Sequence, residues 1–241
     1  MDFSKSMRER LITMRIDIAT LFPDMCEAVL GESIIGRARK AGHIEINCHD
    51  IRTYTLNKHR RVDDKAYGGG TGMVIMPQPV YDCIMAIKNQ LPENARPRLI
   101  YMSPQGRTLT QDIVKELAAE ENLILLCGHY EGIDQRVLDE LEFEEISTGD
   151  YVVTGGELPA LMLADSVARL QEGVLPNEDA YSIESHYNGL LEHPQYTRPE
   201  EWRGRKVPDV LISGHHANIK KWQEEMALKV TEEKRPDLIK G

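Results

Sequence analysis

Short apolar runs rich in β-branched residues alternate along this chain with stretches of helical period, and this order constrains the fold more than any other feature. Arg15–Phe22 is predicted to be a strand, Pro23 to begin a helix, and Ile44–Cys48 to be a second strand. Ser33 is placed to cap a second helix that ends near Gly42. A β-α-β order favours a mainly parallel sheet with helices on both faces, so we predict an α/β fold.

The same alternation continues through the middle of the chain. Leu123–Cys127 is the most apolar run, so it is predicted to be the central strand. The other elements expected here are a strand at Val74–Met76, a helix at Gln78–Gln90, a strand at Leu99–Met102, a helix capped by Thr110 that runs to Glu120, and a helix at Ile133–Leu141.

Glycine-rich turns follow the later strands, in three stretches: Tyr101–Gly106, Cys127–Asp134 and Ile146–Ala160. In the last of these, the β-prone run Tyr151–Thr154 predicts a short strand before the apolar helix Leu158–Leu170. Glycine lets the backbone approach a ligand closely, and open α/β sheets bind ligands at the carboxyl ends of their strands. A tight strand–turn–helix connection explains any one stretch alone, but the three together predict a ligand site.

The helix at 158–170 is apolar around most of its circumference. We therefore expect it to be buried, in part against a second subunit. Its Asp165 and Arg169 lie at i,i+4 spacing, which favours an ion pair. That pair is the purely structural interpretation of Arg169.

Composition excludes several classes of protein. The 241 residues are 41% hydrophobic and 28% charged, and no apolar run is long enough to cross a membrane. The four cysteines form no CxxC pair, which argues against structural zinc and favours a reducing, cytoplasmic location. Residues 1–14 lack the apolar segment of a signal peptide and are predicted to be a polar N-terminal extension, with Met14 an equally good start.

Charge is unevenly distributed. The formal net charge is −10, which argues against non-specific nucleic-acid binding. Residues 198–241, however, contain 10 Lys/Arg and 8 Asp/Glu, a net charge of +2. A basic tail on an acidic body indicates either an RNA contact or a solvated helix.

Residues 50–72 form a long irregular stretch. The basic group Lys58–Arg61 is suited to contact phosphate, while Asp63 and Asp64 are suited to bind a cation or to order the loop. The glycines at 68–72 match neither a Walker loop nor GxGxxG. A surface loop is the simpler interpretation, but loops of this length in compact domains usually have a function.

The chain divides into a body at 15–172, a linker at 173–198 and a small, mostly helical C-terminal domain at 199–241. The linker is rich in Asn, Glu, Ser, His and Pro and has weak periodicity. The C-terminal domain is predicted to contain a strand at Val210–Ile212 and a helix at about Asn218–Lys234.

Several motifs in a fixed order match a known family. They are Leu21–Asp24, Val62–Asp64, Tyr67–Gly70, Ser103–Gly106, Cys127–Gly132, Gly149–Val152, Gly155–Pro159, Tyr196–Pro199 and Val207–Leu211. With these blocks, the chain resembles the bacterial tRNA (guanine-N1)-methyltransferases, which belong to the knotted SPOUT class, from Met14 to about Leu238.

The resemblance implies a deep trefoil knot in the C-terminal half of the body, an uncommon feature in proteins. It also implies a homodimer with active sites at the interface, and S-adenosylmethionine bound in the knot. The residues that it assigns to this cofactor are Tyr101, Met102, Ser103, Pro104, Gln105, Gly128, Glu131, Ser147, Thr148, Gly149, Tyr151, Val152, Val153, Gly155, Gly156 and Pro159.

The implied product is N1-methylguanosine at position 37 of tRNA. This reaction needs a base for the N1 proton and a cation or donor for charge that moves to O6. The resemblance places these roles on Glu184, where the family has aspartate, and on Arg169, with Asp179 as the alternative base. Family members use magnesium, and Glu131 matches the acidic position linked to it. The positions expected to contact tRNA are Asp63, His129, Tyr130, Arg198, Arg203 and Lys220.

The resemblance also implies that residues 173–190 are poorly ordered without tRNA and become ordered when it binds. Three other classes are alternatives: a knotted methyltransferase for ribosomal RNA, a non-enzymatic RNA-binding module, and a Rossmann dehydrogenase. The missing GxGxxG argues against the last. The sequence also argues against a zinc deaminase, because His43-Ile-Glu45 has no Pro-Cys-x-x-Cys partner.

Overall fold

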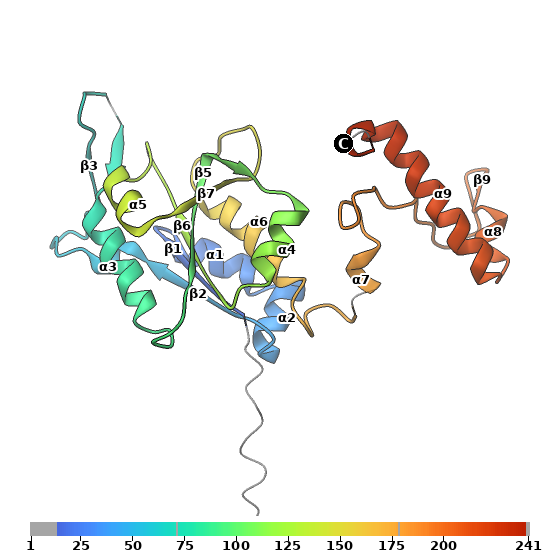
Figure 1. Ribbon diagram of the computed structural model, residues 1–241, viewed down its shortest axis with the longest axis horizontal. Helices are drawn as coiled ribbons and strands as arrows, with labels where there is room; N and C mark the ends of the chain where they lie inside the picture. Colours follow the sequence, from blue (N-terminus) through green and yellow to red (C-terminus); the bar gives the residue numbers. More distant parts are fainter. Residues whose placement is uncertain (1–13, 71, 178, 240–241) are drawn as a thin grey trace, which may run out of the picture. The chain divides into compact units, whose positions relative to one another are not determined.

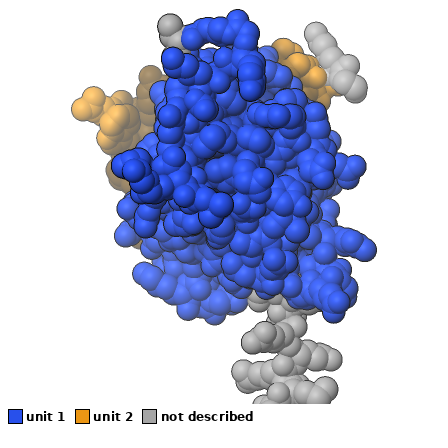
Figure 2. Space-filling view, turned by 90° about the vertical axis from the view of Figure 1, so that its left-hand side faces the viewer, with its two compact units in different colours: residues 1–176 blue, residues 177–241 orange. Residues whose placement is uncertain are grey.

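The computed structural model describes residues 14–70, 72–177 and 179–239 of the chain. The chain forms two compact units, Met1–Pro176 and Asn177–Gly241, coloured blue and orange in Figure 2. The boundary falls inside the predicted linker, so most of the linker belongs to the second unit. The predicted N-terminal extension lies outside the described residues except for Met14.

Unit 1 is built on a five-stranded sheet with the order β2-β1-β6-β5-β7, and every neighbouring pair is parallel. The strands are β1 (Arg15–Thr20), β2 (Glu45–Asp50), β5 (Arg98–Thr108), β6 (Asn122–Cys127) and β7 (Glu144–Ser147). β6 lies at the centre, and residues 123–127 have no exposure to solvent. The predictions of a mainly parallel α/β sheet and of its central strand are confirmed.

Helices cover both faces of this sheet (Figure 1). On one face lie α1 (Pro23–Leu30), α2 (Ser33–Ala41), α4 (Gln111–Ala118) and α6 (Glu157–Ala168). On the other lie the 3-10 helix η2 (Ile51–Tyr54), α3 (Pro77–Lys88) and α5 (Gln135–Leu141). Each face has its own apolar core, because the buried strands are apolar on both sides. No helix among the described residues is long and apolar enough to cross a membrane.

A small hairpin is attached to unit 1 beside the sheet. Its strands, β3 (Asp63–Lys65) and β4 (Met73–Ile75), pair antiparallel. β4 also bonds to the loop after β6: the amide of Glu131 donates to Met73 O at 3.0 Å and that of Ile75 donates to Gly132 O at 3.0 Å. The hairpin is therefore fixed directly to the loop at the carboxyl end of the central strand.

Unit 2 is built around one long helix, α9 (His216–Lys234). Thr231 of this helix is fully buried, and its hydroxyl accepts the amide of Leu191 at 2.9 Å. The other elements of the unit are α7 (Asp179–Ser182), β8 (Glu201–Trp202), β9 (Arg205–Lys206), α8 (Asp209–Ile212) and the 3-10 helix η3 (Pro236–Leu238).

Two strand predictions are wrong. Residues 209–212 form a helical turn, because Pro208 fixes its start and short apolar runs do not distinguish strand from helix. Tyr151–Thr154 forms no strand: β7 lies earlier, at 144–147, and Val152 is 81% exposed with no neighbouring strand to pair with.

Two boundaries also differ from the prediction. β5 continues past Met102 to Thr108, and Ser103–Gly106 form an irregularity in its pairing with β7. Ser33 is the first residue of α2 and not its cap; Glu32 occupies the cap position without a side-chain hydrogen bond. Thr110 does cap α4, since its hydroxyl accepts the amide of Ile113 at 3.4 Å.

Candidate functional site

A pocket lies at the carboxyl ends of the neighbouring strands β5, β6 and β7 of unit 1. Its volume is about 380 Å³, within the range of small-molecule sites. Every residue that the sequence assigned to the cofactor lines this pocket, except Gly149. His129, Tyr130 and Ile133 line it as well.

Three glycines let the loop after β6 and the turn before α6 approach each other closely at this pocket. A Cβ on Gly156 would lie 2.8 Å from both Cys127 Cα and Gly128 N, and a Cβ on Gly128 would lie 2.8 Å from Tyr101 Oη. The Gly156 amide donates to Gly128 O at 2.8 Å, and His129 forms an isolated bridge with Gly155. These contacts join the loop after β6 to the turn before α6. The two segments lie so close that a side chain at these glycines would collide with neighbouring atoms.

Tyr101 forms part of the wall. It is 8% exposed, and burial, with a smaller effect of the Glu145 charge, raises the pKa of its phenol. The hydroxyl therefore stays protonated at neutral pH and remains a hydrogen-bond donor.

His129 presents one unsatisfied polar atom. Its Nδ1 is buried and has no hydrogen-bond partner among the described residues. The ring packs against Phe22 at a centroid distance of 5.1 Å and against Tyr130 at 4.9 Å. Nδ1 lies against the Gly155 backbone, since a Cβ at that glycine would be 2.6 Å from it.

Two residues that sequence reasoning missed hold the turn before α6. Glu157 is 3% exposed, and its Oε1 accepts the hydroxyl of the fully buried Thr20 at 2.7 Å. The Thr20 hydroxyl also accepts the amide of Phe22 at 2.9 Å. Glu157 lies in the first turn of α6, where the helix dipole favours a carboxylate. The only sequence signal was a charged residue directly after two glycines.

Other predicted site residues lie outside this pocket. Asp63 belongs to β3 and pairs with Ile75 of β4. Arg169 follows the last turn of α6, and its amide donates to Asp165 O at 3.0 Å. The remaining predicted residues belong to unit 2: Asp179, Glu184, Arg198, Arg203 and Lys220.

The described residues do not form a metal site of their own. No group of three or more His, Cys, Asp or Glu side chains among them is placed to hold a metal ion. Glu131 lines the pocket and its side chain lies against Gly72, whose Cβ position is 2.3 Å from Glu131 Oε1. One carboxylate is too few to hold Mg²⁺ without ligands from a bound substrate.

A parallel α/β sheet with a glycine-lined pocket at its strand ends defines a class: proteins that bind a nucleotide-like cofactor at the carboxyl edge of the sheet. Comparison with known proteins narrows this class. The family model described as tRNA (Guanine-1)-methyltransferase TrmD matches residues 14–241. The chain therefore belongs to the tRNA (guanine-1)-methyltransferase family.

Curated relatives agree over nearly their whole length. The chain is 57% identical over 226 residues to a tRNA (guanine-N(1)-)-methyltransferase of Ruminiclostridium cellulolyticum, covering 94% of this chain and 96% of the relative. It is 53% identical over 228 residues to one of Shouchella clausii, covering 95% and 92%. A Clostridium perfringens relative of the same name is 52% identical over 226 residues, covering 94% and 93%.

Proposed function

We propose that this protein transfers a methyl group from S-adenosylmethionine to N1 of guanosine at position 37 of tRNA. The observation that carries the proposal is the pocket of unit 1. It is lined by the residues that the family resemblance assigns to the cofactor, in a chain whose family is established along 14–241.

The shape of the pocket supports binding of this cofactor. The glycines at 128, 155 and 156 let the loop after β6 and the turn before α6 approach each other closely. The backbone N–H and C=O groups of such loops are suited to bind an adenine edge and ribose. Tyr101 and Pro159 provide apolar surface. When bound, S-adenosylmethionine supplies a methyl group already activated by its sulfonium charge, so the protein needs placement more than a nucleophile.

The guanine must lose its N1 proton as the new N1–methyl bond forms. We assign that proton to the carboxylate of Glu184, with Asp179 as the alternative, and the stabilisation of negative charge at O6 to Arg169. Arg169 belongs to unit 1 and Glu184 to unit 2. Unit 2, with Arg198, Arg203 and Lys220, is assigned to the anticodon arm.

We further propose a homodimer and a trefoil knot around the pocket. One apolar surface supports the dimer. α1 contacts α6, and the two helices expose Met25 and Val29, Leu158 and Met162, each to at least 42%. A second copy of the chain would bury these side chains. Magnesium is assigned no step, because the described residues form no site for it.

The test is the Glu184→Gln variant in single-turnover methyl transfer. Glutamine keeps the size of the side chain but cannot take the proton, so the transfer rate should fall by about 100-fold or more. S-adenosylmethionine and tRNA affinities should stay within about twofold. A full transfer rate in Glu184→Gln would reject this base, and the same measurement on Asp179→Asn would then test the alternative.

A further inference from the structure

Thr231, on the long helix α9, is the one fully buried polar side chain in the part of unit 2 that the structure describes. Its hydroxyl donates to Ala227 O, one turn earlier, at 2.7 Å. A threonine hydroxyl that donates its proton within its own helix keeps its lone pairs for a donor from elsewhere. That donor is the amide of Leu191, 40 positions earlier, at 2.9 Å. This hydrogen bond attaches the linker to α9 at one defined point.

The residues before Leu191 form a compact turn around Glu184. The Glu184 amide donates to Tyr181 O at 3.2 Å, and Glu184 O accepts the amide of Tyr187 at 3.2 Å. The rings of Tyr181 and Tyr187 pack together at a centroid distance of 5.3 Å. The backbone of Glu184 is therefore held on both sides. We call residues 181–192 the turn segment.

Further hydrogen bonds close the turn segment on itself. The His186 amide donates to Leu190 O at 2.7 Å, and the Glu192 amide donates to Ser185 Oγ at 2.9 Å. These bonds connect the residues on either side of the attachment point to the turn. A shift at the attachment point would therefore be passed to the turn over a short, hydrogen-bonded path.

A second contact holds the next stretch of chain along α9. The ring of Trp222 lies 6.1 Å from the ring of His193 and 6.3 Å from that of Tyr196. Trp222 and Thr231 belong to the same helix, so the chain that follows the turn segment is fixed to α9 at two levels. The same helix also carries Lys220, which is assigned above to tRNA.

We propose that Thr231 is a positioning residue for the proposed methyl transfer. Its hydroxyl fixes the turn segment on α9, and this fixes the Glu184 carboxylate relative to the tRNA that the same helix contacts through Lys220. The proposal rests on the proposed function, which assigns the base to Glu184. Displacement of a catalytic group by about 1 Å can lower a rate about 100-fold, so an anchor for the backbone of the base affects the rate of transfer.

The test uses three variants of the full chain. Thr231→Val keeps the shape of the side chain but removes the hydroxyl, whereas Thr231→Ser keeps the hydroxyl. Ser213→Ala is the matched control in unit 2. The Ser213 hydroxyl also donates to a carbonyl, Val210 O at 2.7 Å, and accepts an amide, His215 N at 3.2 Å, but both partners lie outside the turn segment.

Three quantities are measured for each variant: the single-turnover rate at saturating substrates, the affinities for tRNA and S-adenosylmethionine, and amide hydrogen exchange in the turn segment. Thr231→Val should lower the rate about tenfold and leave both affinities within about twofold, because Thr231 acts on placement of the base. Amides of the turn segment should exchange about tenfold faster in this variant. Thr231→Ser and Ser213→Ala should keep the wild-type rate and exchange within about twofold.

A second comparison shows whether Thr231 acts through Glu184. In a Glu184→Gln background, Thr231→Val should lower the residual rate no further, because the group that it positions is already absent. A full tenfold loss in that background, a wild-type rate in Thr231→Val, or unchanged exchange of the turn segment would overturn the proposal. Wild-type protein that shows the exchange difference but transfers no methyl group to tRNA would instead reject the proposed function and leave the anchor in place.

Discussion

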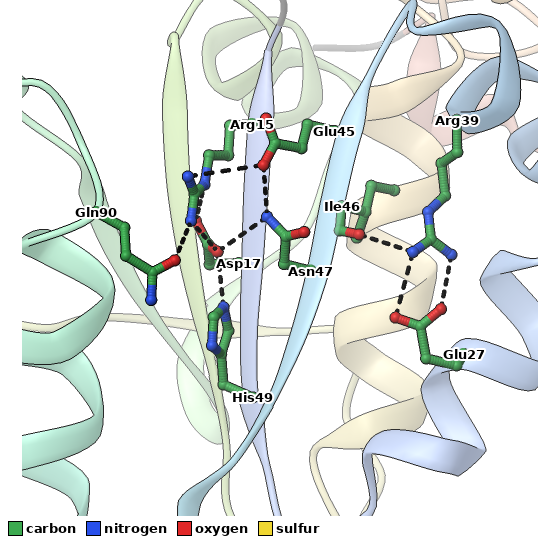
Figure 3. Close-up of polar contacts among 9 residues, drawn as sticks. All are labelled: Arg15, Asp17, Glu27, Arg39, Glu45, Ile46, Asn47, His49 and Gln90. Atoms are coloured by element: carbon green, nitrogen blue, oxygen red, sulfur yellow. Dashed lines mark hydrogen bonds and ion pairs between the residues drawn. The ribbon is translucent and has the colours of Figure 1, made fainter.

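Asp17 is a carboxylate with no exposure to solvent in the middle of β1. Arg15 donates to it from Nε at 2.8 Å, Asn47 from Nδ2 at 3.3 Å, and His49 Nε2 lies 2.7 Å from its Oδ1 (Figure 3). Burial alone would raise the pKa of this carboxyl, but the bonds from His49 and Arg15 outweigh it, so the pKa lies below its ordinary value. The charged form is therefore part of the native structure.

A depressed pKa makes this contribution depend on pH. It is complete above the ordinary aspartate value of 3.8 and is lost as the pH falls through the lower native value. Asp17→Asn should reduce the free energy of unfolding at pH 7 by about 3 kcal/mol, and the difference from wild type should shrink towards pH 3. Urea unfolding across this range measures it, with exposed Glu140→Gln as control. A difference that stays constant with pH would contradict the account.

Thr20 and Glu157 act on the pocket without lining it. The Cβ position of Gly155 lies 2.4 Å from Glu157 Oε2 and 2.6 Å from His129 Nδ1, so two polar side chains pack against the backbone of that turn. The Thr20 hydroxyl holds the carboxylate in place. Removing the Thr20 hydroxyl would leave the buried Glu157 carboxylate without this partner. We expect the turn at Gly155 to shift in response.

Thr20→Val should therefore weaken S-adenosylmethionine binding about tenfold, or ~1.4 kcal/mol, as measured by calorimetry. Thr20→Ser keeps the hydroxyl and should bind normally. Cys83→Ala, at a buried position of α3, controls for general loss of stability. If Thr20→Val binds S-adenosylmethionine normally, or if Cys83→Ala loses as much affinity, then the Thr20–Glu157 hydrogen bond has only a structural role.

Local motifs allowed the pocket lining to be predicted, because those residues are neighbours in sequence at the ends of three strands. The Thr20–Glu157 hydrogen bond was out of reach, since it joins residues 137 positions apart. Sequence patterns specify which residues are near each other along the chain, and only the sheet order brings β1 beside the start of α6.

The helix α6 packs against the sheet on one side and exposes apolar side chains on another. Ala160, Leu163 and Ala164 have no exposure and pack under β1 and β6, whereas Leu158 and Met162 are 49% and 50% exposed. The helix is apolar around most of its circumference, as the sequence showed, but the residues that the structure describes cover only one side of it.

Leu158→Asp/Met162→Asp should therefore convert the proposed dimer into a monomer, because charges on this face would be buried without partners. Sedimentation velocity measures the change, and Ile212→Asp, an exposed apolar residue of α8, is the control. Methyl transfer should fall with the dimer. A monomeric wild type, or a dimer that survives both substitutions, would contradict the proposed interface.

Element type was predictable where periodicity was long and unpredictable where segments were short. The helices and the buried strands of the main sheet have clear patterns. β3 was missed because Asp63-Asp64-Lys65 has no strand composition; its pairing with β4 comes from backbone hydrogen bonds alone. The turn at 209–212 was assigned to strand because three apolar residues fit either period.

At the scale of the whole molecule, the residues assigned to the proposed reaction belong to two units. The pocket and Arg169 belong to the acidic part of the chain, while Glu184 and the basic C-terminal segment belong to unit 2. The expected ordering of residues 173–190 on tRNA binding remains a prediction.

The fold class could be predicted from sequence because alternating strands and helices indicate a parallel sheet. The family could be predicted because many motifs occur in a fixed order. The knot, the dimer and the arrangement of the two units depend on how distant segments pass one another. Local sequence does not encode such crossings directly, so periodicity alone predicts neither the knot nor the dimer.

The most direct measurement is methyl transfer from labelled S-adenosylmethionine to two tRNA transcripts that differ only in G or A at position 37. We predict label on the G transcript alone, recovered as N1-methylguanosine. Equal label on both transcripts would move the target to another base. No label on either, with the cofactor still bound, would contradict the proposed substrate and favour ribosomal RNA or a protein that has lost its catalytic base.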